Sequence, residues 1–105
     1  MYRATTPTHQ FILPFDTSEC KEIQVTYKQG GKSIIKHYQD GTIPPGMTLD
    51  GENVFIRLTQ EETLTFKPGK SVKAQIRVLT ETNDAMASQK FDIKLNDVLN
   101  EEILS

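Results

Sequence analysis

Apolar and polar residues alternate along much of the chain with the period of a β-strand. In the clearest stretch, 72–79, Val72, Ala74, Ile76 and Val78 are separated by charged or polar residues. A repeat of two places one face of a strand in a core and the other face in water. Shorter stretches at 23–28, 54–58 and 91–95 show the same alternation. The pattern therefore predicts a chain built mainly from half-buried strands.

Glycine-containing pairs separate several of these strands and predict tight hairpins. Gly30-Gly31 joins the segment 23–29 to 33–39, and Asp50-Gly51 joins 47–49 to 53–58. Gly and Asp tolerate the positive φ angles that two-residue hairpin turns need. Between the two hairpins, the segment 40–46 holds two prolines and two glycines, which predicts an extended surface loop.

Prolines bracket the first apolar segment. Pro7 and Pro14 flank residues 9–13, and proline is tolerated at the ends and edges of sheets but not within a central strand. The segment 9–13 is therefore expected to be an edge strand, and the short segment 47–49 a second one. An unpaired edge invites pairing with another chain unless it is protected, and the nearby prolines are interpreted as such protection.

A capped helical turn is predicted between the strands 53–58 and 72–79. Thr59 and Glu62 have the spacing of a capping box, in which each side chain accepts a hydrogen bond from the other residue's backbone N–H. Pro68 follows closely and limits the helix to about one turn. Leu64 and Phe66 are expected to be buried beneath this turn and to tie two sheets together.

These elements predict an all-β fold, an immunoglobulin-like antiparallel β-sandwich of about seven strands. A small barrel is the alternative. Residues 1–96 are assigned to the sandwich domain. Residues 97–105 are assigned to a C-terminal tail or short helix, with Asn96 as a possible N-cap. The Cys and Trp hallmarks of antibody domains are absent.

Composition and charge narrow the possible partners. Hydrophobic residues make up 36% of the chain and the net charge is −2. Such a charge gives no bulk attraction to nucleic acid or anionic lipid, so no nucleic-acid or membrane partner is expected. The N-terminus lacks the apolar core of a secretory signal, and a single cysteine, Cys20, fits a reducing compartment. Synthesis in the cytoplasm is expected.

The sequence offers no recognisable catalytic or metal-binding constellation. His9 and His37 have no Cys or carboxylate at ligand spacing, while structural zinc needs about four convergent ligands. Cys20 lacks the surroundings of known nucleophiles, and Gly30-Gly31-Lys32-Ser33 lacks the upstream glycine of a phosphate-binding loop. We therefore expect a non-enzymatic protein with no catalytic residues, no cofactor and no metal.

One charged surface is predicted on two neighbouring strands. Lys73, Arg77, Lys90 and Lys94 occupy outward positions and form a basic stripe if their strands pair as a hairpin. Such a stripe could hold an acidic partner. A solvated sheet face is the favoured interpretation, because Asp92 interrupts the stripe and no exposed aromatic residue accompanies it for base stacking.

Six segments spread along the chain carry a resemblance to known proteins: Thr6-Pro7-Thr8, Phe11-Ile12-Leu13-Pro14-Phe15-Asp16, Val25-Thr26-Tyr27, Leu58-Thr59-Gln60-Glu61-Glu62-Thr63-Leu64-Thr65-Phe66, Arg77-Val78-Leu79-Thr80 and Ala87-Ser88. With these segments the sequence resembles small uncharacterised proteins encoded in Firmicutes prophages, over nearly the whole chain. It is also similar, more faintly, to the N-terminal immunoglobulin-like module of upper baseplate proteins of siphophages that infect Gram-positive bacteria.

The resemblance implies a phage structural or assembly protein of the tail, baseplate or neck. Such a protein is located in the virion and works through contacts with itself or with other virion proteins. The alternative is a module that binds carbohydrate or a host surface. Sugar sites usually present exposed aromatic residues, and Tyr2, Tyr38 and Phe55 are the aromatic residues that the pattern leaves free for this role.

A homo-oligomer is expected, because virion parts act by symmetric repetition. Its contact is predicted to include apolar residues on outward positions and the apolar face of the C-terminal segment. These candidate interface residues are Phe55, Leu79, Val98, Leu99, Ile103 and Leu104.

Overall fold

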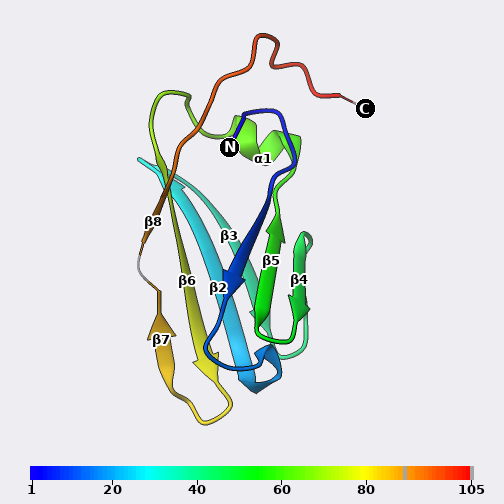
Figure 1. Cartoon of the computed structure of the whole chain (residues 1–105), viewed down its shortest axis with the longest axis vertical. Coiled ribbons are helices and arrows are strands. Elements are labelled where there is room, and N and C mark those ends of the chain that lie inside the picture. The colour runs from blue at the N-terminus through cyan, green and yellow to red at the C-terminus, as the bar shows by residue number, and fades with distance from the viewer. Residues whose placement is uncertain (89, 105) are drawn as a thin grey trace.

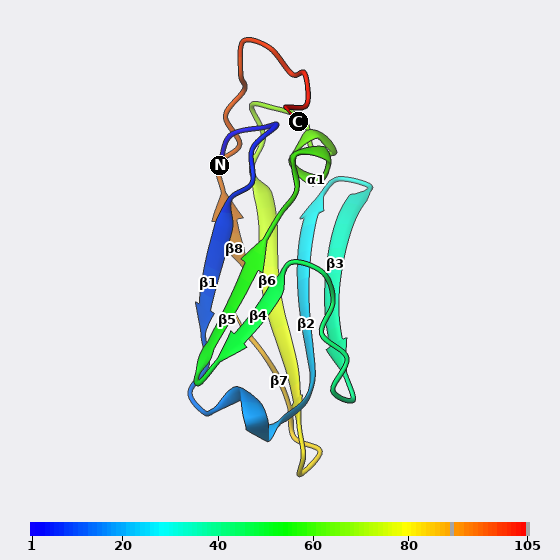
Figure 2. The same cartoon turned by 90° about the vertical axis from the view of Figure 1, so that its right-hand side faces the viewer.

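Two antiparallel β-sheets face each other across one hydrophobic core in the computed structural model of the chain (Figures 1 and 2), which describes residues 1–88 and 90–104. The small sheet has the order β1-β5-β4, and the large sheet has the order β3-β2-β6, with β7 and β8 both pairing the far edge of β6. The strands are β1 (Thr8–Ile12), β2 (Cys20–Gln29), β3 (Lys32–Gln39), β4 (Met47–Asp50), β5 (Asn53–Arg57), β6 (Val72–Thr80), β7 (Ala85–Ala87) and β8 (Phe91–Ile93).

The predicted all-β sandwich is confirmed, with eight strands in the described residues in place of about seven. The difference arises at the last predicted strand, because β7 and β8 pair with β6 as two separate pieces. The alternation at 91–95 belongs to a strand predicted over 89–95. Its first residue, Gln89, lies outside the described residues, as does the last residue of the tail, Ser105.

The strand order corresponds to that of immunoglobulin domains, whose sheets are ordered A-B-E-D and C-F-G, with C′ added beside C in some. Taken in chain order, β1 to β6 occupy the positions of strands B, C, C′, D, E and F, and β7 with β8 occupies that of G. Strand A of this scheme has no counterpart beside β1 in residues 1–88 and 90–104.

The predicted alternation decides which side chains fill the core. Ile23, Val25 and Tyr27 of β2 are fully buried, and Val54 and Ile56 of β5 face them from the small sheet. On β6 the buried positions are Val72, Ala74, Ile76 and Val78, and the residues between them are more exposed. Both predicted hairpins form, between β2 and β3 and between β4 and β5. The β4–β5 turn residues are Gly51 and Glu52, one position later than predicted, because Asp50 already pairs with Asn53.

The capped turn joins the two sheets as expected. Helix α1 (Gln60–Leu64) begins at Thr59, whose hydroxyl accepts from the Glu62 N–H at 3.1 Å, and the Glu62 carboxylate accepts from the Thr59 N–H at 2.9 Å. Phe66 is fully buried, as predicted. The prediction that Leu64 is buried was wrong, since it is only half-buried. Thr63 is the residue of α1 that is buried.

The remaining helical element is a 3₁₀ turn, η1 (Thr17–Glu19), between β1 and β2. The Asp16 carboxylate caps it by accepting from the Ser18 N–H at 2.9 Å. Hydrogen bonds from the Thr17 N–H and hydroxyl to the Gly51 carbonyl, both 2.8 Å, join this turn to the β4–β5 hairpin.

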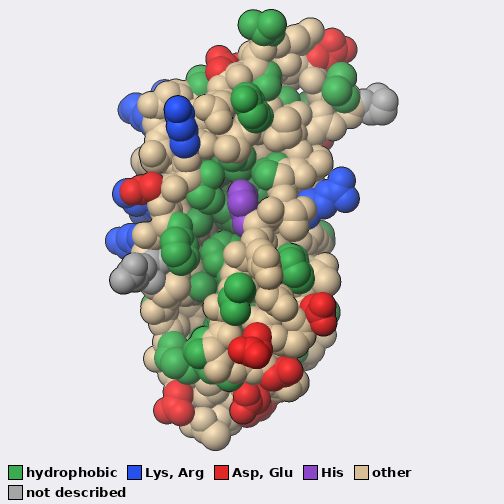
Figure 3. Space-filling model, in the orientation of Figure 1, with side chains coloured by type: hydrophobic (Ala, Val, Ile, Leu, Met, Phe, Trp, Pro, Cys, Tyr) green, Lys and Arg blue, Asp and Glu red, His purple; other side chains and the backbone are tan. Residues whose placement is uncertain are grey.

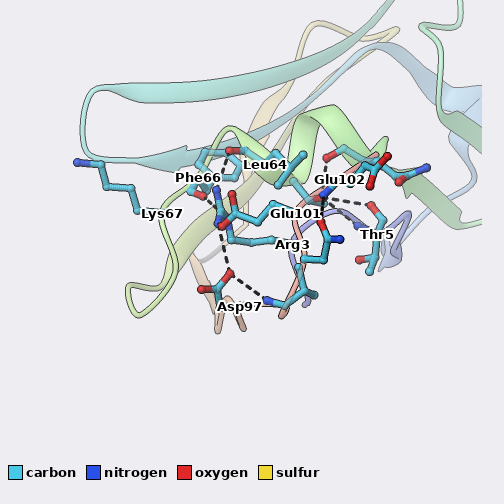
Figure 4. Close-up of polar contacts among 12 residues, drawn as sticks. Arg3, Thr5, Leu64, Phe66, Lys67, Asp97, Glu101 and Glu102 are labelled. Carbon is cyan, nitrogen blue, oxygen red and sulfur yellow. Dashed lines mark hydrogen bonds and ion pairs between the residues drawn. The ribbon is translucent and has the colours of Figure 1, made fainter. Parts of the chain in front are cut away.

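The C-terminal segment crosses one end of the sandwich without forming a helix in residues 97–104. Contacts from distant residues hold it against this end of the sandwich. Arg3 forms ion pairs with Asp97 and Glu101 and donates to the Phe66 carbonyl (Figure 4). The Gln60 side chain exchanges two hydrogen bonds with the Leu104 backbone, at 2.7 and 2.8 Å. Of the two predicted forms, a tail or a short helix, residues 97–104 adopt the tail. Distant residues bind the side chains of Asp97 and Glu101 and the backbone of Leu104.

Candidate functional site

The six predicted interface residues lie on three different parts of the surface. Phe55 is on the outer face of the small sheet, opposite Gln10 and Thr48 in the strand register. Leu79 is on the outer face of the large sheet, opposite Glu22. The other four belong to the C-terminal segment, which crosses one end of the molecule (Figure 1). One contact between two copies therefore does not bring all six residues together.

The C-terminal segment presents the most exposed of these apolar side chains. Leu99 is fully exposed, Leu104 is 77% exposed and Ile103 is 44% exposed, whereas Val98 is half-buried. The segment is nevertheless held on its own chain, because Arg3 pairs with the carboxylates of Asp97 and Glu101 and the Gln60 side chain binds the Leu104 backbone. The segment thus docks through polar contacts and leaves its apolar side chains facing outward.

The predicted basic stripe forms in part. Lys73, Arg77 and Lys90, together with Lys28 of β2, line a shallow hollow of about 430 Å³ on the outer face of the large sheet. Lys94 lies outside this hollow. Asp92 interrupts the stripe as expected, because its carboxylate pairs with Lys73 Nζ at 2.6 Å.

The titratable groups named from the sequence sit in separate surroundings. His9 Nδ1 shares a 2.8 Å hydrogen bond with the buried Tyr27 hydroxyl, and burial lowers the pKa of His9. His37 pairs with Glu22 on the outer face of the large sheet, at 2.9 Å. Burial raises the pKa of the Cys20 thiol, and the carboxylates of Glu19, Asp16 and Glu81 raise it further.

Neither a metal site nor a membrane span is found where the structure describes the chain. No group of three or more His, Cys, Asp or Glu side chains there could hold a metal ion. No helix within the described ranges is long and apolar enough to cross a membrane.

The three aromatic residues considered for sugar binding do not share a surface. Tyr2 is exposed at the end of the sandwich where it pairs with Asn96. Tyr38 is packed against the core from β3. Phe55 is half-buried on the outer face of the small sheet. They therefore do not form a common platform on which a sugar ring could stack.

One edge of the small sheet lacks a strand partner. Backbone hydrogen bonds join the Leu58 N–H to the Pro7 carbonyl and the Leu13 N–H to the Glu52 carbonyl. In an antiparallel pair, hydrogen-bonded residues alternate with residues whose N–H and C=O groups point away. The odd-numbered residues of β1 therefore bond to β5, and Thr8, Gln10 and Ile12 direct their backbone groups to the other side, where the described chain places no strand.

A groove runs beside this unpaired edge. Two adjoining hollows, of about 520 and 210 Å³, lie between β1 and the strands β7 and β8. Phe11 and Ile12 line one wall, Met86 and Phe91 line the other, and Ile76 of β6 contributes to the floor. Figure 3 shows hydrophobic side chains gathered along this hollow. We call this side of the molecule the open side.

Among the residues that the structure describes, the open side carries no charged side chain along the groove. The lining contains neither Lys, Arg, Asp nor Glu, and the lowered pKa of His9 favours its neutral form at pH 7. Ile12 is 72% exposed, Phe91 46% and Met86 42%. Such a patch, apolar and beside unpaired backbone groups, is typical of a surface that binds another polypeptide.

The edge strands on the opposite side of the molecule are β3 and β4, and an inward charge protects this side against pairing with another chain. Lys36 of β3 points between the sheets, and its Nζ lies 2.7 Å from the Glu62 carboxylate on α1. Burial raises the pKa of Glu62, but hydrogen bonds from Lys36 and from the Thr59 backbone outweigh it and hold the pKa below its ordinary value. We call this side, defined by β3, β4, Lys36 and Glu62, the closed side.

Comparison with known proteins does not add an identity. No protein-family model matches the sequence, and none of the curated proteins matches it significantly. The candidate site therefore rests on the chain's own geometry.

Sequence reasoning identified β1 as an edge strand from Pro7 and Pro14, but it did not identify the groove. The strand pattern shows which residues of β1 face inward. It does not show that β7 and β8 extend past β1 in the opposite layer, which is what creates the hollow. The sequence signal that could have indicated an apolar groove at this edge is the run from Thr6 to Phe15, which contains no Lys, Arg, Asp or Glu.

Proposed function

We propose that this protein is a non-enzymatic structural or assembly module that works by binding other polypeptides. The open side is the observation that carries this proposal. An exposed apolar groove next to three residues with unpaired backbone groups is a surface built for contact. The absence of charge along its lining favours association by burial of apolar area, and neither a charged substrate nor nucleic acid fits such a surface.

We further propose that the module belongs to a phage particle, as part of a tail, baseplate or neck. The support for this placement is the sequence resemblance to small prophage-encoded proteins. The immunoglobulin strand order is compatible with it, although a fold by itself does not determine a function.

Detection of the protein in purified particles tests the phage placement. The prophage of the host that carries the gene would be induced, the particles purified by density gradient, and their proteins quantified by mass spectrometry. The expected result is a fixed ratio of this protein to the tail or baseplate proteins. A protein that is abundant in the lysate but missing from the particles would refute the placement.

Self-association through the C-terminal segment is a second part of the proposal. Leu99, Ile103 and Leu104 are exposed there, and a symmetric contact could bury them. Sedimentation of the full chain and of a chain ending at Asn96 tests it. We expect the full chain to associate more strongly, and a full chain that stays monomeric at high concentration would contradict the expectation.

A further inference from the structure

The two layers of the sandwich differ in width by one strand. The large sheet is four strands wide, because β7 and β8 both lie beyond β6, whereas the small sheet ends at β1 after three strands. Figure 1 shows β7 and β8 lying to the side of β1, past the edge of the small sheet. The groove of the open side is the space between this edge and the overhanging strands.

The free position next to β1 corresponds to strand A in the immunoglobulin order. In that order strand A pairs with strand B, and β1 occupies the position of B. The N-terminal residues do not fill this place. They cross the end of the sandwich, where the Arg3 N–H donates to the Asn96 carbonyl at 3.0 Å and the Asn96 N–H donates to the Met1 carbonyl at 2.7 Å.

We propose that the open side binds one uncharged, extended segment of a different protein, which adds to β1 as a fourth strand of the small sheet. This inference rests on the proposed function and names its surface and the kind of partner. The unpaired N–H and C=O groups of Thr8, Gln10 and Ile12 form the ladder, which gives affinity without regard to sequence. The pairing is antiparallel, like every paired strand in the two described sheets.

The side chains of the groove specify the pattern of the partner. Alternate residues of the added strand point inward, where Phe11, Phe91 and Ile93 are within the groove lining, so these residues are apolar. The residues between them lie beside Thr8, Gln10 and Ile12 on the outer face and are polar but uncharged. Because burial of an unpaired charge against this lining is costly, ionised residues are excluded from the inward positions.

The length of the added strand is limited by proline. Pro14 has no N–H to offer at the free edge, and its even number places it in the row of outward-directed backbone groups. The ladder therefore ends at Ile12, so the partner contributes a segment of about five or six residues.

The overhang of β7 and β8 argues against β1 of a second copy as the occupant. Two copies joined through β1 would bring β7 and β8 of each copy into the same place in the second layer. The C-terminal segment of another copy is equally unsuited, because Asp97, Glu101 and Glu102 give it three negative charges. A single neutral strand from another protein satisfies both the shape and the charge of the groove.

A selection from random twelve-residue peptides against the immobilised full chain tests this inference. We expect the enriched peptides to be uncharged over five or six residues with apolar side chains at alternate positions. The best peptide, synthesised with a fluorescent label, would then be titrated by anisotropy against wild-type protein. Replacement of one inward apolar residue of that peptide by Glu is expected to weaken binding at least about tenfold.

Two variants at one position separate the ladder from other modes of binding. Gln10→Pro removes an N–H at the free edge and leaves the backbone hydrogen bonds to β5 in place, and edge strands tolerate such a proline. Like the control below, it also loses the 2.8 Å hydrogen bond from Gln10 Nε2 to Asn53 Oδ1, so the two variants differ in the backbone N–H. Gln10→Thr keeps the N–H and serves as the matched control. We expect the proline variant to bind the peptide at least about tenfold more weakly and the threonine variant to bind within about threefold of wild type.

A third variant keeps the test decisive if Gln10→Pro fails to fold. Phe91→Glu puts a charge into the groove at a residue that is 46% exposed, and it is expected to abolish binding while far-UV circular dichroism stays unchanged. Failure to enrich any peptide, enrichment of charged peptides, or equal binding by folded Gln10→Pro protein would overturn the inference. A wild-type dimer that Gln10→Pro dissociates would also overturn it, because the occupant would then be a second copy.

These outcomes are independent of the test for the phage placement. A protein that is missing from virions can still bind a neutral strand in the groove. A virion component that binds no such peptide would retain the proposed placement and lose the proposed mode of contact.

Discussion

The two lateral edges of the sandwich, the closed side and the open side, differ in the charge of their edge strands. On the closed side, the edge strand β3 carries an inward lysine, Lys36, whose Nζ is 2.7 Å from the Glu62 carboxylate. On the open side, β1 carries no charge and faces an apolar groove. An inward charge is a common protection against unwanted strand pairing. Its presence on one side and its absence on the other support the proposal that the open side is a contact surface.

The largest expected effect on stability comes from a substitution in the core that both sides share. Phe66 is fully buried beneath α1 at the point where the chain crosses between the sheets. Phe66→Ala should lower the free energy of unfolding by about 3–5 kcal/mol, the usual cost of deleting a large core side chain. Urea unfolding followed by circular dichroism measures it. A loss below about 1 kcal/mol would show that the crossover does not hold the two sides together.

At Gly46, in the loop before β4 on the closed side, a single added methyl group is expected to be destabilising. Gly46 has a φ of +85°, and a Cβ there would lie 2.5 Å from the Arg57 carbonyl oxygen. Because both the backbone conformation and the contact are unfavourable, Gly46→Ala should cost about 1–3 kcal/mol. Gly31→Ala is the control, since nothing lies within 4 Å of a Cβ at that position. Equal midpoints for the two variants would contradict the close packing of the closed side.

Removal of the protecting charge should make the closed side resemble the open side. Lys36→Met keeps an apolar stem of similar length but leaves Glu62, 22% exposed, without its partner. We expect a loss of about 1–2 kcal/mol, because water still reaches part of the carboxylate. Light scattering should also show increased association through β3. The double variant with Glu62→Gln tests the coupling, and additive losses would mean that the pair contributes little.

Much of this architecture could be predicted from local sequence, as particular elements illustrate. Period-two alternation identified β2, β5 and β6, because each strand buries one face. The Thr59 and Glu62 pair identified α1, because a capping box is complete within four residues. Gly30-Gly31 and Asp50-Gly51 identified the two hairpins. In each case, the interactions that decide the structure lie close together in the chain.

The elements that sequence reasoning missed depend on distant partners. Asn96 has the side chain of an N-cap for the C-terminal segment. The backbone N–H and C=O of Asn96, however, are bound by Met1 and Arg3. The inward direction of Lys36 is not evident from its neighbours, because Glu62 lies on another element. The groove follows from a difference in width between two layers. Patterns within one strand contain no information about such differences.

The open side should also respond to pH through His9. Burial, and secondarily the N-terminal ammonium group, lower the pKa of His9 below 6.5. The unfolded chain therefore takes up a proton more readily than the folded chain. The corresponding stability is complete above about pH 6.5 and is lost as the pH falls through the lowered pKa. Unfolding midpoints at pH 7.5 and 5.5 should differ more for wild type than for His9→Gln. Equal differences would show that His9 does not titrate with folding.

The smallest effect on stability is expected at the rim of the open side. Ile12 is 72% exposed, and its side chain lies on the outer face of the small sheet. Ile12→Lys should therefore change the free energy of unfolding by less than about 0.5 kcal/mol, as surface substitutions usually do. The same charge should hinder an approaching neutral strand, as edge lysines do in other sheets. If Ile12→Lys leaves stability unchanged and weakens peptide binding, the unpaired edge serves in contact and is not needed for folding. A large loss of stability would instead indicate that Ile12 belongs to the core, and the contrast between the two sides would then be smaller than the strand register indicates.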